Sequence, residues 1–567
     1  MHGVAADLTP TDPPPAEGRD ETAPGGRRGV RALALALLAL LLIRLVQPGQ
    51  PIVENYAGRQ VPTAMVARNL ERGSGFFRPI LDTAPFPNYF LVEPPVYQAA
   101  ACGLRGLTGW GLEPCGRAIS ALAMVLGALG LHGLVVRREG ERVALPAVFA
   151  FGLLPVTIRY GRSFQPDALM LGLILIGLDC WDRAERGGTT LWRVAGWLLL
   201  AIGFAAKVTG GFVLGPLWFA ILSRRSPSSR PSRGSTVGAP HSSLPHEVGG
   251  RSGSSPPPSW GRVRVGGESG KSLARCLAIG LLAASALLPA LLWYAWADRL
   301  LETGGGSAAS AANRSIWLKV VGLSALASAE TLGHLGRFLL VRSFTPLGLA
   351  LGCWGLLMRG CHAGPAGGRD IWKLWAGTAL LLMAMLAAKL HHEYYWLVLA
   401  PPVAVGMGRA WRRLSGSHRA AAWACAGVFA AMSVVLSLST YRTPPEWRHL
   451  EAAAAAVRRT VPRTVPPGAL LVAPEPLLYQ ADFRGCRLEY TESAARRAAE
   501  EWRVAGADRV GGPLDLIAFY RTMGAGFLAD VAAGPSDSRR EDLHRLIRGR
   551  YKVLVESESV LIVELNP

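Results

Sequence analysis

Two carboxylates stand where this chain could carry out acid–base chemistry. Glu54 follows the first apolar run, and Glu93 opens the motif Glu-Pro-Pro-x-Tyr-Gln at 93–98. A carboxylate held just above a bilayer can act as a general base toward an acceptor hydroxyl or amine. Each acid also has a plainer interpretation, Glu54 as a solvated loop acid and Glu93 as an acid that complements a helix dipole. The sequence leaves open which of the two is the base.

Three cations and a His-aromatic motif could bind the anionic part of a substrate. Arg159 and Arg162 fall in a tight turn between two apolar runs, where two guanidinium groups suit a phosphate. Lys207 lies at the tip between two later runs, where it could also extend to the interface without any function. The motif His-x-x-Tyr-Tyr at 391–395 opens another run, and an anchoring aromatic belt is its alternative role.

All of these residues fall on one side if the apolar runs are threaded through a membrane. The residues that share this side are Glu54, Arg59, Glu93, Arg159, Arg162, Asp167, Lys207, His391, His392, Glu393, Tyr394 and Tyr395. Randomly scattered loop residues would divide between both faces of the membrane. The pattern therefore indicates a site built at a membrane surface.

The composition favours a polytopic membrane protein. Half of the 567 residues are hydrophobic, 18% are charged, and the mean hydropathy is +0.25. With Arg27, Arg28 and Arg31 held inside, about eleven spans of bilayer length follow. We expect them near 32–47, 116–136, 143–158, 166–181, 191–206, 209–223, 273–293, 338–358, 371–388, 396–410 and 419–439. The segments 48–115 and 294–337 then form outer loops, with interfacial helices expected near 96–107 and 316–327.

Charge and cysteine content argue against two other classes of protein. The net charge of +20 is spread through short loops, whereas a nucleic-acid-binding protein gathers its basic residues on one face. The eight cysteines show no CxxC pattern and no regular spacing. We therefore expect no nucleic-acid partner and no metal ligand set.

Three domains are expected. Residues 1–29 are a disordered cytoplasmic tail, 30–440 the membrane domain, and 441–567 an extracytoplasmic α/β domain. Within the membrane domain, 224–272 has almost no apolar content and is expected to be a disordered inner-loop insertion. In the last domain we expect strands at 470–473, 487–490, 551–555 and 560–564, helices at 494–504 and 539–549, and a terminal hairpin over 552–565.

The order of motifs resembles a known family. An acid follows the first span, and then come Glu-Pro-Pro-x-Tyr-Gln at 93–98, Tyr-x-Arg-x-x-x-Pro-Asp at 160–167, Ala-Lys-x-Thr at 206–209 and His-x-x-Tyr-Tyr at 391–395. This order resembles the bacterial family-39-like and aminoarabinose-transferase-like integral membrane glycosyltransferases, which have the GT-C fold, over about residues 30–440. The family commonly has Asp where this chain has Glu54, and His where it has Tyr56, so Glu93 could be the aligned acid instead.

The resemblance implies a mostly α-helical GT-C bundle, a polyprenyl-phosphate-linked sugar as donor, and inversion at the anomeric carbon. Glu54 takes the place of the family's catalytic acid. The donor-phosphate and substrate-binding residues are then expected to be Arg59, Tyr97, Arg159, Arg162, Asp167, Lys207, His391, His392, Tyr394 and Tyr395. The acceptor would be a glycan, a lipid or a protein of the cell envelope at the outer face of the bacterial inner membrane.

One base suffices for an inverting transfer, and phosphate is already a good leaving group, so no cofactor is required, with a divalent metal as the open alternative. The first alternative is a transporter or flippase of lipids or glycans. It would favour broken helices or polar residues near the bilayer midplane and internal repeats. A receptor for lipid-linked glycans without catalytic activity is the second alternative.

Overall fold

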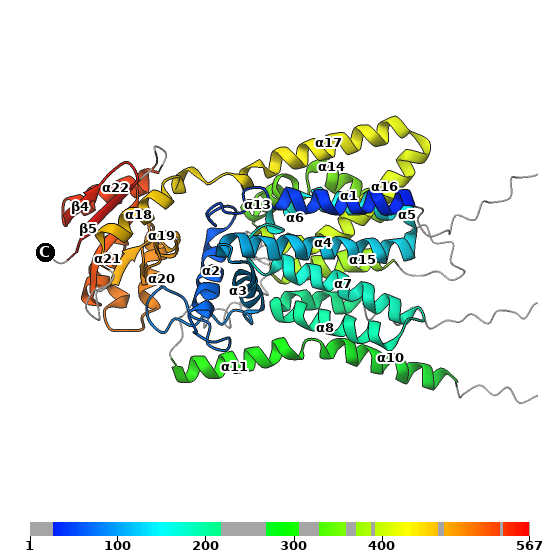
Figure 1. The fold of residues 1–567 in the computed structure, drawn as a ribbon, viewed down its shortest axis with the longest axis horizontal. Coiled ribbons are helices and arrows are strands. Elements are labelled where there is room, and N and C mark those ends of the chain that lie inside the picture. Colours follow the sequence, from blue (N-terminus) through cyan, green and yellow to red (C-terminus); the bar gives the residue numbers. More distant parts are fainter. Residues whose placement is uncertain are drawn as a thin grey trace, which may run out of the picture.

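The structure, a computed structural model, describes residues 27–216, 268–304, 328–358, 370–386, 392–462, 470–532, 534 and 537–565. A bundle of long helices occupies one end of the molecule and a mixed sheet with its own helices the other (Figure 1). Most of the expected tail 1–29, most of the insertion 224–272, the helix near 316–327 and His391 lie outside these residues.

The bundle is built from α-helices and short 3₁₀ or π segments. In chain order they are α1 (Arg27–Arg44), α4 (Leu112–Glu139), α5 (Glu141–Leu153), α6 (Pro155–Tyr160), α7 (Asp167–Glu185), α8 (Thr190–Ala206), η1 (Val208–Val213), α10 (Glu268–Ser285), α11 (Leu288–Gly304), α13 (Ala329–Arg337), η3 (Phe338–Ser343), α14 (Pro346–Leu357), α15 (Ile371–Met385), η5 (Glu393–Leu399), α16 (Ala400–Ser417) and α17 (Arg419–Ser437). Glycines let neighbouring helices approach closely, as is common in membranes. A Cβ added at Gly355 of α14 would lie 1.8 Å from the carbonyl oxygen of Gly406 in α16.

Two helices within the described residues are long and apolar enough to cross a membrane, Leu112–Glu139 and Arg419–Thr460. Two bent pairs raise that number to four if each counts as one span. The pairs are Leu277–Ser285 with Leu288–Glu302, bent by 43°, and Leu332–Ser343 with Pro346–Leu357, bent by 94°. The expected count of about eleven spans stays a prediction.

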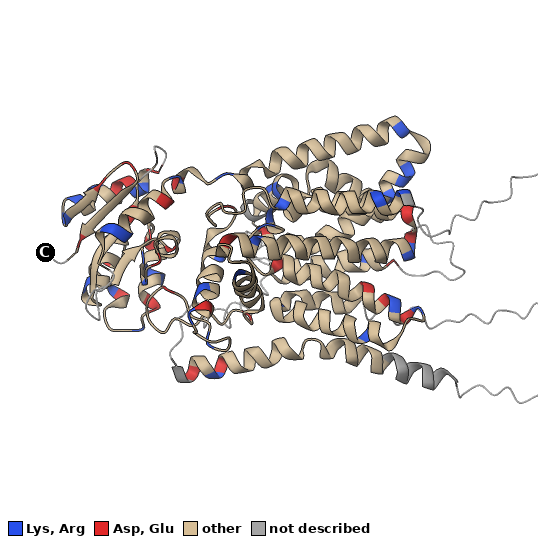
Figure 2. Cartoon of the chain, in the orientation of Figure 1, with Lys and Arg blue, Asp and Glu red and all other residues tan. Residues whose placement is uncertain are grey.

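Charged residues are sparse along the middle of the bundle and gather at its two ends (Figure 2). At the end away from the sheet, Arg409 donates to both carboxylate oxygens of Glu139, at 2.7 and 2.6 Å, and to Asp370 at 2.6 Å. This network ties α16 to α4 and to the start of α15.

The first expected outer loop, 48–115, forms two helices between the bundle and the sheet (Figure 1). They are α2 (Ala57–Glu71) and α3 (Val96–Thr108), and α3 matches the helix expected near 96–107. Gly109 ends α3 in the left-handed conformation, at φ 71°, which glycine adopts without steric cost.

The C-terminal part contains a five-stranded sheet in the order β2-β1-β3-β5-β4. Its strands are β1 (Leu470–Ala473), β2 (Gly485–Arg487), β3 (Ala525–Val531), β4 (Lys552–Glu556) and β5 (Val560–Glu564), with β1 parallel to β2 and β3 and the others antiparallel. Its helical segments are η6 (Leu438–Tyr441), η7 (Pro445–Trp447), α18 (Leu450–Thr460), α19 (Glu475–Ala481), α20 (Glu492–Glu500), η8 (Ala507–Arg509), α21 (Pro513–Thr522) and α22 (Ser538–Arg548).

The sequence-based assignments here are mostly confirmed. Strands β1, β4 and β5, helices α20 and α22, and the hairpin of β4 and β5 lie where they were expected, within a few residues. The strand expected at 487–490 is wrong in position, because β2 ends at Arg487, where its pairing with β1 ends. Strand β3 was not expected.

The first loop pairs with the edge of this sheet. The amide of Gly485 donates to the carbonyl of Asp82 at 2.9 Å, and the amide of Ala84 donates to the carbonyl of Gly485 at 2.7 Å. Arg68 of α2 forms ion pairs with Asp82 and Asp482, at 2.5 and 3.0 Å. The sheet is therefore joined directly to the loop that carries the candidate acids.

Candidate active site

A buried ion pair joins the start of α7 to the end of α8. Lys207 follows the last residue of α8, and its Nζ lies 2.6 Å from Oδ1 of Asp167, the first residue of α7. The same Nζ lies 4.1 Å from the ring centroid of Tyr394 and 5.0 Å from that of Tyr395. Oδ2 of Asp167 is buried and has no hydrogen-bond partner among the described residues. A carboxylate oxygen in that state can still accept a bond from a ligand.

A second buried ion pair lies beside the first. Arg59 in the first turn of α2 pairs with Glu93, just before α3. Burial lowers the pKa of Arg59, but Glu93, Tyr394 and Asp167 together raise it above its ordinary value. Burial lowers the pKa of Lys207, against the opposing effect of Asp167, while Arg59 and Glu93 also act on it. The two pairs therefore share one electrostatic environment.

We call the group that shares this environment the paired-charge cluster. It consists of Arg59, Glu93, Asp167, Lys207, Tyr394 and Tyr395. Four sequence motifs and helix α2, which lie far apart along the chain, supply its members, and the sequence placed all of them on the same side.

Stacked aromatic rings connect this cluster to the residues around Glu54. The ring of Tyr56 lies 4.7 Å from His392, which stacks on Tyr394 at 5.4 Å with an interplanar angle of 6°. Tyr394 and Tyr395 are 4.6 Å apart. The rings therefore connect Tyr56, two residues after Glu54, to Tyr394, over which Lys207 lies.

Glu54 is fully buried and is held by an arginine that the sequence analysis missed. Nη2 of Arg117 in α4 donates to Oε1 of Glu54 at 2.7 Å, and both side chains are 0% exposed. The other oxygen, Oε2, is buried without a hydrogen-bond partner among the described residues. The available signal was an arginine at the start of an apolar run, where a charged residue needs a partner.

Arg117 also shapes the loop before Glu54. Its guanidinium donates to the carbonyls of Pro48, Gln50 and Pro51. One buried side chain therefore fixes both the course of this loop and one oxygen of its carboxylate.

Arg159 and Arg162 are turned toward backbone carbonyls. Nη2 of Arg162 donates to Val46 at 2.7 Å and Gln47 at 3.2 Å, and its Nη1 donates to the carbonyl of Thr440. Nη2 of Arg159 donates to the carbonyl of Leu436 at 2.5 Å. These contacts fasten the last turn of α6 and the turn after it to the ends of α1 and α17, and they place both guanidinium groups outside the paired-charge cluster.

Tyr97 also points away from that cluster. Its hydroxyl donates to the carbonyl of Gly116 at 2.7 Å and lies 3.1 Å from the hydroxyl of Ser120. Its ring meets Phe164 edge-on at 5.4 Å. These contacts position α3 against α4.

An apolar groove of about 520 Å³ begins next to the paired-charge cluster. It is lined by Val208, Thr209, Phe212, Tyr294, Thr378, Leu381, Leu382 and Met385. Val208 directly follows Lys207, and the hydroxyl of Tyr294 donates to the carbonyl of Val92, next to Glu93, at 3.0 Å. The groove, with α15 and η1 among its walls, therefore lies beside the two ion pairs. Among the described residues, no three His, Cys, Asp or Glu side chains are placed to hold a metal ion.

Comparisons of sequence point to one class of enzyme. A family model described as dolichyl-phosphate-mannose-protein mannosyltransferase matches residues 92–235. Two Bacillus subtilis proteins named as mannosyltransferases are similar in part. YkcB is 25% identical over 190 residues, which is 33% of this chain and 26% of YkcB. YycA is 28% identical over 109 residues, which is 19% of this chain and 16% of YycA. The matches thus span about a quarter or less of these relatives.

Solved structures share the fold over most of the chain. ArnT from Cupriavidus metallidurans, bound to undecaprenyl phosphate, has a TM-score of 0.53 at 14% identity and covers 95% of this chain and 98% of its own. The archaeal oligosaccharyltransferase AglB from Archaeoglobus fulgidus, with an inhibitory peptide and a dolichol-phosphate, has a TM-score of 0.52 at 11% identity, over 89% of this chain and 69% of AglB. The arabinofuranosyltransferase AftD from mycobacteria has a TM-score of 0.56 at 15% identity, and the match covers 96% of this chain and 42% of AftD. The matching family model and the shared fold confirm the recognition made from the sequence, a resemblance to the GT-C integral membrane glycosyltransferases.

Proposed function

We propose that this protein is an inverting glycosyltransferase. It moves a sugar from a polyprenyl-phosphate donor to a glycan, lipid or protein acceptor of the cell envelope, at the outer face of the bacterial plasma membrane. The observation that carries the proposal is the adjacency of the apolar groove and the paired-charge cluster. A lipid chain with a charged phosphate and a sugar at one end needs both environments side by side.

The groove would hold the polyprenyl chain, because its lining is almost wholly apolar and Val208 places it next to Lys207. Lys207 and Arg59 would then bind the donor phosphate. The phosphate gains negative charge as the sugar leaves, so these cations stabilise the transition state more than the bound donor. Arg159 and Arg162, whose guanidinium groups bind carbonyls, would act by holding the loops in place.

Glu54 is the proposed base. Arg117 fixes one carboxylate oxygen, and the unpartnered Oε2 can accept the proton of the acceptor hydroxyl or amine. The acceptor oxygen or nitrogen forms a bond to the anomeric carbon, the bond from that carbon to the phosphate oxygen breaks, and the phosphate keeps the electron pair. Glu93 is the alternative base, although its ion pair with Arg59 favours a role in shaping the phosphate site.

Mass spectrometry of lipids and envelope glycans, in cells with and without the protein, tests the proposal. We expect the polyprenyl-phosphate sugar to accumulate and one sugar to disappear from an envelope component when the protein is absent. Glu54→Gln should reproduce the loss, and the matched control Glu541→Gln, on the exposed face of α22, should not. Loss in Glu93→Gln with activity retained in Glu54→Gln would transfer the base role to Glu93. If the envelope glycans are unchanged but the lipid-linked sugar moves from one face of the membrane to the other, the result would instead support a transporter.

A further inference from the structure

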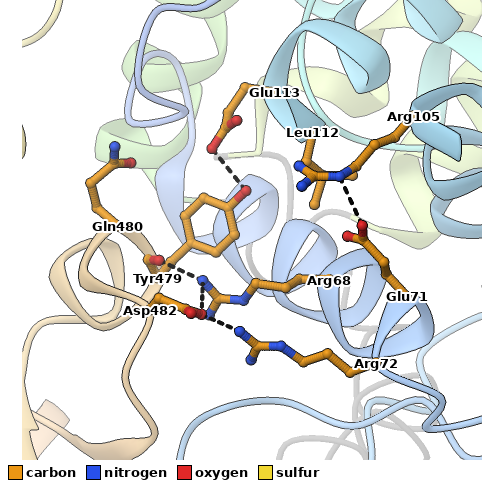
Figure 3. Close-up of a pocket in the computed structure, with 9 residues that line it drawn as sticks. All are labelled: Arg68, Glu71, Arg72, Arg105, Leu112, Glu113, Tyr479, Gln480 and Asp482. Carbon is orange, nitrogen blue, oxygen red and sulfur yellow. Dashed lines mark hydrogen bonds and ion pairs between the residues drawn. The ribbon is translucent and has the colours of Figure 1, made fainter. Parts of the chain in front are cut away.

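A second cavity, of about 480 Å³, lies between the first outer loop and the C-terminal sheet unit. Figure 3 shows its lining, with side chains from α2, α3, the start of α4 and α19 around a common space. The residues that line it are Arg68, Glu71, Arg72, Arg105, Leu112, Glu113, Tyr479, Gln480 and Asp482. We call this cavity the α2–α19 pocket. Its volume falls in the range of about 300–1,000 Å³ that is usual for small-molecule sites.

The lining of the α2–α19 pocket alternates between donors and acceptors. Arg105 donates to Glu71 at 2.9 Å, and the hydroxyl of Tyr479 donates to Glu113 at 2.9 Å. Arg72 pairs with Asp482. Three guanidinium groups and three carboxylates thus balance one another, so a phosphate would meet as much repulsion as attraction.

A hydroxyl-rich ligand fits this lining better than an ion or an apolar molecule. A sugar hydroxyl both donates and accepts, and therefore can bridge a guanidinium and a carboxylate that already lie at hydrogen-bond distance. Arg72, Arg105 and Glu71 are 44%, 39% and 42% exposed, so these groups are reachable from solvent. Leu112 is the one aliphatic side chain among the residues that line the pocket, so a lipid chain would find few apolar partners there.

The position of the pocket also says which part of a substrate it could hold. Arg68 and Arg59 lie on the same helix, nine residues apart, and this separation corresponds to about 13 Å along α2. A group bound in the pocket is therefore too far from the paired-charge cluster to react there. Leu107, in the last turn of α3, and Trp110, between α3 and α4, are 87% and 56% exposed, as expected for residues that touch lipid at the membrane surface.

We propose that the α2–α19 pocket binds a neutral glycan portion of the acceptor, remote from the hydroxyl or amine that receives the sugar. The inference rests on the proposed function. Binding energy gained at this distance would select acceptors and hold them in place for transfer. Because exposed Leu107 and Trp110 lie on the chain segment between Arg105 and Leu112 of the pocket, the acceptor glycan can belong to a glycolipid.

A charge swap in the pocket tests this inference. The double variant Glu71→Arg with Arg105→Glu keeps the ion pair but exchanges the positions of donor and acceptor. Exposed pairs of this kind contribute little to stability, so the variant should fold. The matched control is the swap Asp542→Arg with Arg545→Asp on α22, where the two exposed side chains form a pair at 3.4 Å.

Binding is measured on the full chain in nanodiscs, in the Glu54→Gln background so that no transfer occurs. The probes are α-1,2-mannobiose, N,N′-diacetylchitobiose and a pool of glycolipids extracted from the envelope. We expect at least one probe to bind, and the pocket swap to weaken it about tenfold or more, while the α22 swap leaves it unchanged. Binding of the free disaccharides would identify the glycan alone as the ligand, and binding of the glycolipid pool only would identify a lipid-anchored glycan.

Two results would overturn the inference: no binding of any probe, or equal binding in the two swapped proteins. The proposed function fails separately. If Glu54→Gln and Glu93→Gln both leave the envelope glycans unchanged while the pocket swap abolishes binding, the pocket stays a glycan site and the catalytic proposal is wrong.

Discussion

Lys207 and Asp167 form a buried ion pair at the point where α8 ends and α7 begins, with Nζ and Oδ1 2.6 Å apart. Lys207 also lies over the ring of Tyr394. Both charges are removed from water, so their mutual attraction only partly offsets the cost of burial. An arrangement of this kind is more easily explained by a charged ligand than by stability alone.

Removal of Lys207 should impair both stability and activity. We expect Lys207→Met to lower the free energy of unfolding by about 3–5 kcal/mol, because Asp167 would be left buried and unpaired. Transfer should fall about a hundredfold or more, since one cation facing the leaving phosphate is lost. Thermal unfolding in detergent and a radiolabelled transfer assay would measure the two effects.

The double variant Lys207→Met with Asp167→Asn separates these effects. It removes both charges, so most of the stability should return while transfer stays low. Recovery of transfer in the double variant would show that the pair serves the fold alone.

Arg117 should matter more to stability than its partner does. Arg117→Met leaves the carboxylate of Glu54 and several carbonyls without a donor, and we expect a loss of about 3–5 kcal/mol. Glu54→Gln keeps an oxygen acceptor for Arg117, whose guanidinium also binds the carbonyls of Pro48, Gln50 and Pro51, so its loss should be smaller, about 1–3 kcal/mol. Melting temperatures of the two variants test this order, and equal values would contradict it.

Glu475, at the start of α19, should make the fold sensitive to pH. Burial raises its pKa from 4.5 to about 7, with Arg487 opposing and Glu489 and Glu501 reinforcing the rise. The folded protein therefore holds this proton more tightly than the unfolded chain. The preference of the folded protein for protonated Glu475 therefore stabilises the fold fully below about pH 4.5, and this stabilisation is lost as the pH rises toward 7.

Glu475→Gln cannot ionise and should escape this loss. Relative to the natural chain, we expect little difference at pH 4.5 and a gain of up to about 3 kcal/mol above pH 8. The free energy of unfolding of the full chain in detergent, measured at the two pH values, tests this gain, with Glu541→Gln as an exposed control. A gain that is equal at both pH values would rule out titration of Glu475 as its cause.

The membrane orientation can be tested by cysteine labelling in a cysteine-free background. Phe77→Cys lies in the first outer loop and Thr190→Cys at the start of α8, and both positions are exposed. We expect an impermeant maleimide to label position 77 from outside intact cells and position 190 only after the cells are opened. The reverse pattern would place the paired-charge cluster on the cytoplasmic side.

The convergence of Arg59, Glu93, Asp167 and Lys207 could be predicted from the sequence because each lies at an end of an apolar run. The sequence places these residues at the same end of the bundle, and packing then decides which of the residues at that end touch. The terminal hairpin was equally predictable, since β4 and β5 are close in sequence and rich in β-branched residues.

The roles of Arg159 and Arg162 could not be predicted in the same way. Their partners are carbonyls of residues such as Val46 and Thr440, which are far away along the chain. The sequence shows the charge but not the groups that it faces. Strand β3 was missed because Gly526 and Asp530 are unfavourable in strands, and pairing on both sides overrides that preference.

The bonds between Gly485 and the first loop have a consequence for anyone who divides this protein. Asp82 and Ala84 cover the outer edge of β2, an edge that would otherwise be open to pairing with other chains. A version cut after residue 460 would leave the loop that carries Glu93 without its hydrogen bonds to the sheet. The released sheet would expose the unpaired edge of β2, which can pair with other chains. The two halves should therefore be expressed and purified as one piece.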